Sequence, residues 1–174
     1  IFEMYQSGAI GFYDFKNPVN NPNLLKIALQ YVQSFDGLVF SFPFEKSICP
    51  NGQMHEGEIS TSYGLKGIPT VSEEIMIKRD LKLLEYTGGK MHIPCISTKE
   101  SVGLIKLAKK NKMNITCSVS INNLFFNDEK LKNFDTRFKV LPPIRSEDHR
   151  KALIKGVNDG TIDFVTSDHS PIDI

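Results

Sequence analysis

Short apolar runs alternate with longer stretches of helical periodicity along most of the chain. Six runs are rich in β-branched and aromatic residues, as strands are, and they lie at residues 9–15, 37–42, 90–96, 114–119, 137–141 and 163–167. Between them, apolar residues recur at helical spacing over residues 23–34 and 71–86, after residues 97–100, and over residues 146–158. This alternation is typical of a parallel β/α architecture.

Two stretches carry more specific signals. The predicted helix at 71–86 is preceded by Thr70 and includes Glu73, and these two residues resemble a capping box. The residues expected on its buried face are Ile75, Ile77, Leu81 and Leu84. The long polar stretch 43–69 predicts an extended loop above the carboxyl end of a strand, and loops of that length in compact domains tend to be functional.

About six strands are too few to close an eight-stranded barrel of roughly 250 residues. The alternatives are an open doubly wound sheet and a piece of a barrel. The sequence begins at Ile1, just ahead of a strand-like run, and stops at Ile174 with no helix to cover the last strand. We therefore expect residues 1–174 to form a single domain, a partial TIM-type (β/α)8 barrel of about six β/α units that lacks the first strands and the C-terminal part.

Charge and cysteine content exclude several classes of function. The chain has 21 basic and 20 acidic residues and no basic stripe interleaved with aromatics, so we expect neither a nucleic acid nor a membrane surface as partner. No apolar run approaches the roughly 20 residues of a membrane span, and we expect a cytoplasmic location. The three cysteines are odd in number and form no C-x-x-C pair, which predicts free thiols.

Residues with reactive side chains follow several of the predicted strands, and in a parallel barrel these strand ends meet at one mouth. They are Asp14, His92, Cys95, Asn122, Asn123 and Asp168. A binuclear metal site needs several imidazoles and carboxylates there, and the chain has only four histidines. We interpret His92 as a satisfied interior histidine and His149 as a surface residue, whereas for His169 an interior or functional role is equally favoured.

Asp168 is the sharpest candidate for chemistry. A carboxylate at a strand end can serve both as a metal ligand and as the base that takes a proton from metal-bound water, and an equally weighted alternative is a loop hydrogen-bond acceptor. For Asp14, a role as turn former is somewhat favoured. Arg145 follows Pro142 and Pro143 and could hold an anion or a carboxylate, although a structural role is at least as well supported.

Several strings together resemble the dihydroorotases of the amidohydrolase superfamily, from about Gly8 to Pro171. They include NGQMHEG, GIPTVSEE, HIPCIST, PPIRSEDHRKALI and DGTIDFVTSDHSP, in order and at family-like spacing; hydantoinases and allantoinases share parts of them. The resemblance implies a (β/α)8 barrel with one or two zinc ions at its mouth. In that family, metal-bound hydroxide attacks the ring amide carbonyl of dihydroorotate and a strand-eight aspartate shuttles the proton, a step of pyrimidine biosynthesis.

The match to the family's metal site is uneven. Asp168 matches the strand-eight aspartate, and Asp14 matches the bridging aspartate. Pro43 stands where the family has a histidine ligand and provides no ligand atom, and Cys95 stands where the family has another histidine. A thiolate can bind zinc, so the resemblance implies Asp14, Cys95 and Asp168 as candidate metal ligands, with Asp168 also catalytic.

The substrate side is also changed. Leu141 replaces an asparagine, Ile172 replaces a histidine that contacts the substrate carboxylate, and Asn122 with Asn123 replaces a histidine pair. Among the residues that remain, His169 and Asn122 are the candidate substrate contacts. The family's first strand, with its His-x-His pair, is not in this chain.

These substitutions predict a dihydroorotase-like protein that is catalytically impaired or inactive, with zinc weakly bound or absent, and that is retained as a scaffold. Aspartate carbamoyltransferase is the expected partner, and we expect a homo-oligomer. The alternative is an active zinc-dependent cyclic amide hydrolase with an altered metal site, which converts dihydroorotate to carbamoyl aspartate. A third hypothesis keeps the mouth as a pocket for a different, more apolar ligand.

Overall fold

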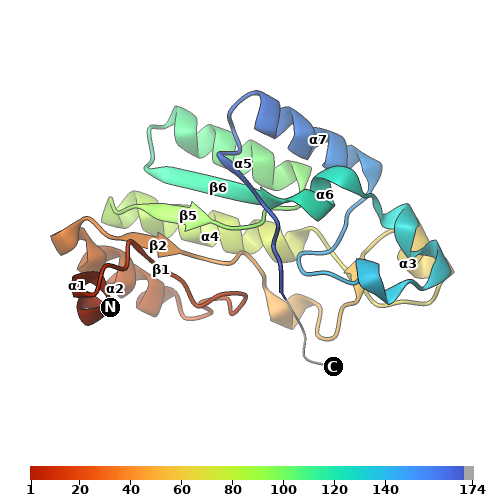
Figure 1. The fold of residues 1–174 in the computed structure, drawn as a ribbon, viewed down its shortest axis with the longest axis horizontal. Coiled ribbons are helices and arrows are strands. Elements are labelled where there is room, and N and C mark those ends of the chain that lie inside the picture. Colours follow the sequence, from red (N-terminus) through yellow and green to blue (C-terminus); the bar gives the residue numbers. More distant parts are fainter. Residues whose placement is uncertain (171–174) are drawn as a thin grey trace.

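A curved parallel sheet of five strands forms the centre of the fold (Figure 1). The computed structural model describes residues 1–170. The strands are β1 (Gly11–Phe12), β2 (Leu38–Phe40), β5 (Met91–Ile93), β6 (Ile115–Ser120) and β7 (Phe164–Thr166). They lie in the order β1-β2-β5-β6-β7, and all four pairings are parallel. The sheet is thus part of the wall of a β/α barrel.

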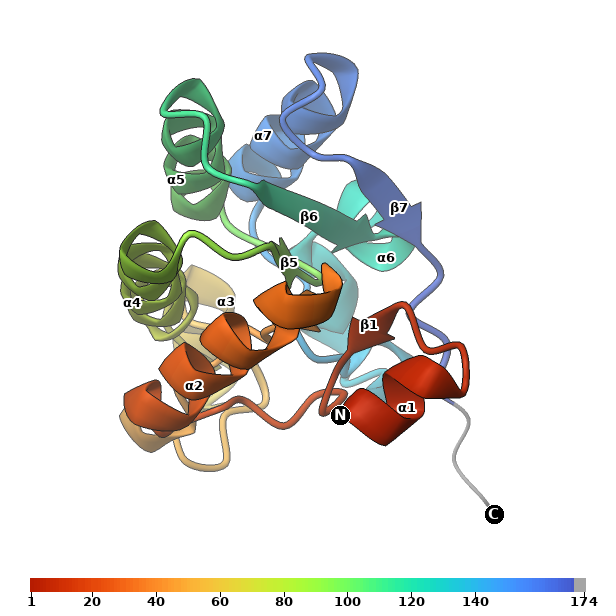
Figure 2. The ribbon, with the colours of Figure 1, turned by 90° about the vertical axis from the view of Figure 1, so that its left-hand side faces the viewer.

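Four long helices cover the outer face of this sheet, as Figure 2 shows. They are α2 (Pro22–Val32), α4 (Val71–Thr87), α5 (Lys99–Lys110) and α7 (Glu147–Asn158). Their ends follow local chemistry. The Asn21 side chain accepts hydrogen bonds from the backbone N–H groups at the start of α2, and α4 ends at Gly88, whose φ of 72° favours glycine.

The main core lies between the sheet and these helices. It contains fully buried side chains from each layer, including Leu29, Ile77, Met91, Ile105 and Leu153. Removal of apolar surface from water contributes about 25 cal/mol per Å², so this layer supplies much of the stability that holds the strand ends in place. The opposite, concave face of the sheet lines a cavity.

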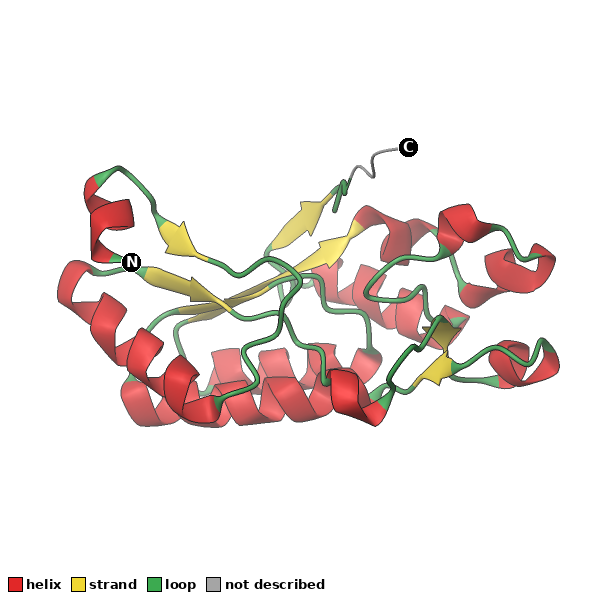
Figure 3. Ribbon diagram, turned by 90° about the horizontal axis from the view of Figure 1, so that it is seen from below, coloured by secondary structure: helices red, strands yellow, loops and turns green. Residues whose placement is uncertain are grey.

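Residues 43–69, expected as an extended loop, contain part of a small lobe at one end of the sheet (Figure 3). A two-stranded parallel sheet, β3 (Met54–His55) and β4 (Gly67–Ile68), flanks the short helix α3 (Glu58–Ser62). A separate apolar cluster of Met54, Leu131 and Ile144 holds the lobe together. The remaining short elements are α1 (Phe2–Gln6), α6 (Ile121–Phe125), and 3-10 turns at Gln33–Phe35, Lys46–Ile48, Asp128–Asn133 and Thr136–Phe138.

The predicted strand at 137–141 is wrong. Residues Thr136–Phe138 form a 3-10 turn, and Phe138 and Val140 pack against the cluster of the small lobe. Their alternation therefore reflects burial in the lobe. Pro142 and Pro143 follow directly and have no backbone N–H to donate to a sheet.

Two details of α4 also differ from expectation. The Thr70 side chain makes no capping hydrogen bond, and Thr70 itself has a helical backbone, with φ of -62° and ψ of -32°. The Glu73 side chain turns into the interior and binds other partners. Ile75 is 44% exposed, and Met76 takes its place in the interior. In the part of the chain described, no helix combines the length and apolar character needed to cross a membrane.

Candidate functional site

The concave face of the sheet lines a cavity of about 830 Å³. Its wall runs from the segment after β1 to the segment after β7, and it extends along the central strands from their amino ends, near Leu38 and Met91, to their carboxyl ends. We call these carboxyl ends the mouth. Cys95, Asp168 and His169 all line the cavity, so the structure brings together three of the site residues predicted from the sequence.

Cys95 and Asp168 occupy equivalent positions at the mouth. Each lies two residues beyond the end of its strand, and each has a left-handed backbone, with φ of 53° and 51°. Such values are uncommon for residues other than glycine. The hydroxyls of Ser118 and Thr166 accept the backbone N–H groups of Cys95 and Asp168, each at 3.2 Å. Hydroxyl groups of the sheet thus hold both turns toward the cavity.

Lys16 is the partner of Asp168. Its Nζ lies 2.8 Å from Asp168 Oδ2, and the two side chains are 19% and 10% exposed. Lys16 belongs to the segment after β1, so the ion pair joins the two edges of the sheet across the mouth. Sequence reasoning missed this residue, because a lysine in a turn carries no signal of a partner at the other end of the chain.

Burial dominates the electrostatics of the other polar groups at the mouth. It raises the pKa of the Cys95 thiol to about 12, with a further contribution from the negative charge of Asp168. Burial also raises the pKa of the Tyr13 hydroxyl, again with contributions from Cys95 and Asp168. Both groups are therefore protonated at neutral pH in the metal-free protein.

His92 is an interior histidine with both ring nitrogens in hydrogen bonds, as expected. Nδ1 lies 2.8 Å from Thr116 Oγ1, and Nε2 lies 3.1 Å from Ser118 Oγ. Burial lowers its pKa to about 4, so the ring is neutral at physiological pH. Although it borders the cavity, its nitrogens are already used by the sheet.

Two candidate residues are not brought to the cavity. Asp14 is exposed, and its backbone carbonyl accepts the N–H of Asn17 at 3.0 Å, as in a turn. Asn122 lies in α6 and does not line the cavity. Its neighbour Asn123 is buried and donates to the carbonyl of Pro143 at 2.8 Å, which gives it a structural role. Ile172 lies outside the described residues.

The side chains at the mouth do not form a recognisable metal site by themselves. Within residues 1–170, no three histidine, cysteine, aspartate or glutamate residues gather closely enough to hold a metal ion. A catalytic zinc site takes three protein ligands and a water molecule. Asp168 is engaged by an ammonium group, Cys95 is a buried thiol, and Pro43 has no donor atom. This donor set does not fit zinc.

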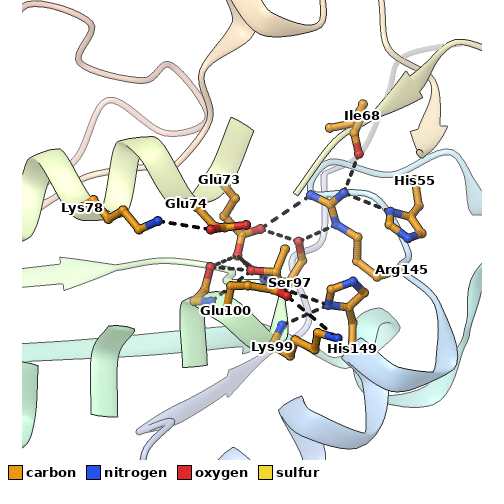
Figure 4. A network of polar contacts seen from close by, with 12 residues as sticks. His55, Ile68, Glu73, Glu74, Lys78, Ser97, Lys99, Glu100, Arg145 and His149 are labelled. Carbon is orange, nitrogen blue, oxygen red and sulfur yellow. Dashed lines mark hydrogen bonds and ion pairs between the residues drawn. The ribbon is translucent and has the colours of Figure 1, made fainter. Parts of the chain in front are cut away.

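A second polar network lies behind the mouth and supports it (Figure 4). The carboxylate of Glu73 accepts the backbone N–H groups of Ser97 and Thr98 at 2.9 and 3.1 Å, and the Ser101 hydroxyl at 2.5 Å. Arg145 donates to the Ile68 carbonyl at 2.6 Å and to Ser97 Oγ at 3.1 Å. The carboxylate that Arg145 faces is thus Glu73, within the protein, and its role is structural.

The histidines of this network are buried. His149, expected at the surface, is 6% exposed because its ring turns inward and Nδ1 accepts the Lys99 backbone N–H at 3.0 Å. His55 Nδ1 lies 3.2 Å from the guanidinium of Arg145. Burial, together with the charge of Arg145, lowers the pKa of His55 to about 3, and burial lowers that of His149 as well. All three cysteines are free, as predicted, and all three are buried.

Comparison with known sequences gives consistent matches. The family model described as dihydro-orotase-like matches residues 4–101. A dihydroorotase from Acetivibrio thermocellus is 42% identical over 171 residues, which is 98% of this chain and 40% of the relative. A putative dihydroorotase from Rhodopirellula baltica is 41% identical over 165 residues, 95% of this chain and 36% of the relative. The chain spans about two fifths of the length of such relatives.

Solved structures agree on the fold. The L-hydantoinase of Arthrobacter aurescens superposes with a TM-score of 0.78 at 20% identity, over 96% of this chain and 39% of that chain. A dihydropyrimidinase from Brevibacillus agri superposes with a TM-score of 0.79 at 18% identity, over 98% of this chain and 39% of that chain. The expected partial β/α barrel is thereby confirmed.

Proposed function

Because this chain belongs to the dihydroorotase family of the amidohydrolase superfamily, we propose that it is a catalytically impaired or inactive member, retained as a scaffold. The donor set at the mouth is the observation that carries the proposal. A metal ion in such an enzyme polarises the substrate carbonyl, and that requires ligands that are deprotonated and free. Among the described residues, the mouth supplies Asp168, which is already paired with Lys16, and the buried thiol of Cys95, and no third ligand lies close enough to complete a site with them.

The cavity wall supports the same proposal from the substrate side. Aromatic side chains of Tyr13, Phe15, Phe40 and Phe164 border it. Leu141, which stands where the family resemblance implies an asparagine, faces a different and smaller pocket. Each hydrogen bond lost to a buried polar substrate weakens its binding free energy by about 1–3 kcal/mol. Loss of several such contacts therefore abolishes useful binding of dihydroorotate.

The scaffold role takes aspartate carbamoyltransferase as its partner, an expectation that comes from the family resemblance. The experiment is size-exclusion chromatography with light scattering on the full-length protein, alone and mixed with aspartate carbamoyltransferase from the same organism. We expect a homo-oligomer alone and a larger complex in the mixture. Two separate peaks at micromolar concentration would contradict this partner.

Dihydroorotate hydrolysis by the full-length protein, with and without added zinc, tests the loss of activity. We expect no turnover above that of an Asp168→Ala variant purified in the same way. The variant controls for host enzyme carried through purification. Turnover at an ordinary enzymatic rate that disappears in Asp168→Ala would overturn the proposal.

One observation favours the alternative of an active zinc-dependent hydrolase with an altered site. Cys95 and Asp168 lie at equivalent strand ends and both face the cavity, so a ligand from outside the described residues could complete a site with them. This alternative requires about one zinc ion per chain after dialysis. It also requires that Cys95→Ala and Asp168→Ala each remove both zinc and activity.

A further inference from the structure

Lys16 and Asp168 form a fixed ion pair rather than a surface contact. Their charged atoms are 2.8 Å apart, and both side chains are mostly buried. They lie 152 positions apart in the sequence, on segments that follow the first and the last strand of the sheet. Exposed ion pairs contribute little, but removing one member of a buried pair leaves the other charge uncompensated.

The lysine lies at the oxygen that a metal ion would use. Asp168 Oδ2 receives the ammonium group directly. A divalent cation bound to the same carboxylate would lie within a few ångströms of this positive charge, and two cations repel each other strongly at that distance. The ammonium and a divalent cation therefore compete for one carboxylate.

Left-handed backbone occurs on both sides of the pair. Phe15, directly before Lys16, has a φ of 46°, and Asp168 has a φ of 51°. Left-handed backbone at residues other than glycine is costly and persists where surrounding contacts impose it. The Lys16 Nζ also lies 5.8 Å from the centroid of the Phe15 ring, within the range of a cation–π interaction. The ring of Phe15 is thus a second contact of the ammonium group, beside the carboxylate of Asp168.

We propose that Lys16 is a permanent internal cation that takes the place of a metal ion at Asp168 and keeps divalent cations from this carboxylate. The inference deepens the proposed function and rests on it, since a barrel that no longer needs a metal can neutralise its remaining aspartate with a side chain. It makes a separate claim about metal binding, which is measured without any assay of activity.

The test is equilibrium dialysis of the full-length protein against Zn²⁺, with the bound metal counted by mass spectrometry. Lys16→Met removes the charge and keeps the length of the side chain. A single carboxylate is only part of a zinc site, so binding stays weak, but we expect the zinc affinity of the variant to be at least about tenfold higher than that of the wild type. Adding Asp168→Asn to Lys16→Met should remove the gain. Lys16→Arg keeps the positive charge and should behave as the wild type does.

Lys90→Met is the matched control. Lys90 also lines the cavity, but it pairs with Asp36, whose side chain is 80% exposed, so its loss should leave zinc binding unchanged. If Lys16→Met does not fold, Lys16→Gln carries the same test, because it keeps a hydrogen-bond donor for Asp168 without the charge. An equal gain in Lys90→Met, or no gain in a folded Lys16 variant, overturns the inference.

The two proposals fail in different ways. Turnover by a wild-type protein that binds no zinc would overturn the loss of activity and leave the role of Lys16 intact. One equivalent of tightly bound zinc in the wild type, unchanged in Lys16→Met, would overturn the role of Lys16 whatever the activity. Zinc gained by Lys16→Met without turnover supports both.

Discussion

The guanidinium of Arg145 lies 3.9 Å from the carboxylate of Glu73, and both side chains are almost completely buried. Glu73 belongs to α4, and Arg145 lies in the segment before α7. The same carboxylate accepts the N–H groups of the turn between β5 and α5. One buried pair thus connects two helices of the outer layer to the turn that carries Cys95, and it fixes part of the mouth from behind.

Removing Glu73 should destabilise the fold strongly. Glu73→Ala leaves the charge of Arg145 buried without a counter-charge and should lower the free energy of unfolding by about 3–5 kcal/mol, measured by urea denaturation. Glu74→Ala is the control, because Glu74 follows directly in α4 and pairs at 3.3 Å with Lys78, whose side chain is 58% exposed. Its loss should cost less than about 1 kcal/mol. Equal effects of the two changes would show that the network does not support the fold.

Stability should fall on mild acidification. In the folded protein the pKa of His55 is lowered to about 3 and that of His92 to about 4. The unfolded chain takes up protons on these histidines below about pH 6.5 while the folded chain does not, so stability decreases as the pH falls from 6.5 toward 4. Each histidine should contribute a loss of about 2 kcal/mol by pH 5.

The variant His55→Gln isolates one of these contributions. It removes one titrating group, so its free energy of unfolding should depend less steeply on pH between 5 and 6.5 than that of the wild type. Chemical denaturation at several pH values gives the free energy of unfolding of both proteins. Because the carboxylates are the same in both, their contribution cancels in the difference. Parallel curves for the two proteins would contradict the assignment to His55.

The cysteines should resist alkylation in the native protein. Cys95 and Cys117 are buried, with pKa values raised to about 12, and Cys49 is buried with a raised pKa. The thiolate is the reactive form, so iodoacetamide at neutral pH should modify these residues slowly, and rapidly once denaturant is added. Peptide mapping by mass spectrometry reads each site. Fast labelling of Cys95 alone would indicate an open mouth.

The main core should be sensitive to cavities. Leu29 in α2 is fully buried between the helices and the sheet, so Leu29→Ala should cost about 2–5 kcal/mol in the free energy of unfolding. Ile27 in the same helix is 49% exposed, and Ile27→Ala is the matched control with a much smaller expected cost. Urea denaturation of both variants measures the difference in their free energies of unfolding, provided that this free energy depends on the urea concentration with the same slope in each.

Local pattern was sufficient to predict most of the framework. The helix predicted over 71–86 is observed at Val71–Thr87, and the apolar run at 114–119 is observed as a strand at Ile115–Ser120. The run of β6 is buried along almost its whole length, and α4 buries Ile77 and Leu84 of the four residues expected on its inner face. At 137–141 the same alternation misled, because a small second core can bury alternate side chains without a partner strand.

The site could be predicted only in part. Cys95 and Asp168 were found because strand ends converge in any parallel β/α sheet, which is a rule of topology. The role of Lys16 could not be predicted, because its partner Asp168 lies far away in the sequence. The role of Glu73 could not be predicted either, because it depends on the direction in which its side chain turns. A glutamate near the start of a helix is expected to cap that helix. In the interior, however, the Glu73 carboxylate accepts hydrogen bonds from three hydroxyls and two backbone N–H groups, and these stabilise it more than a single exposed capping contact would.

The order of the strands in the sheet has a consequence for how the molecule is assembled. Each strand of the main sheet pairs with the one that precedes it in that sheet, so the sheet can grow at one edge as the chain emerges during synthesis. The cost of closing each intervening loop rises only slowly with its length. The contact between Lys16 and Asp168 is different, since it must wait until β7 has docked. Formation of this contact therefore reports that the last strand of the sheet is in place.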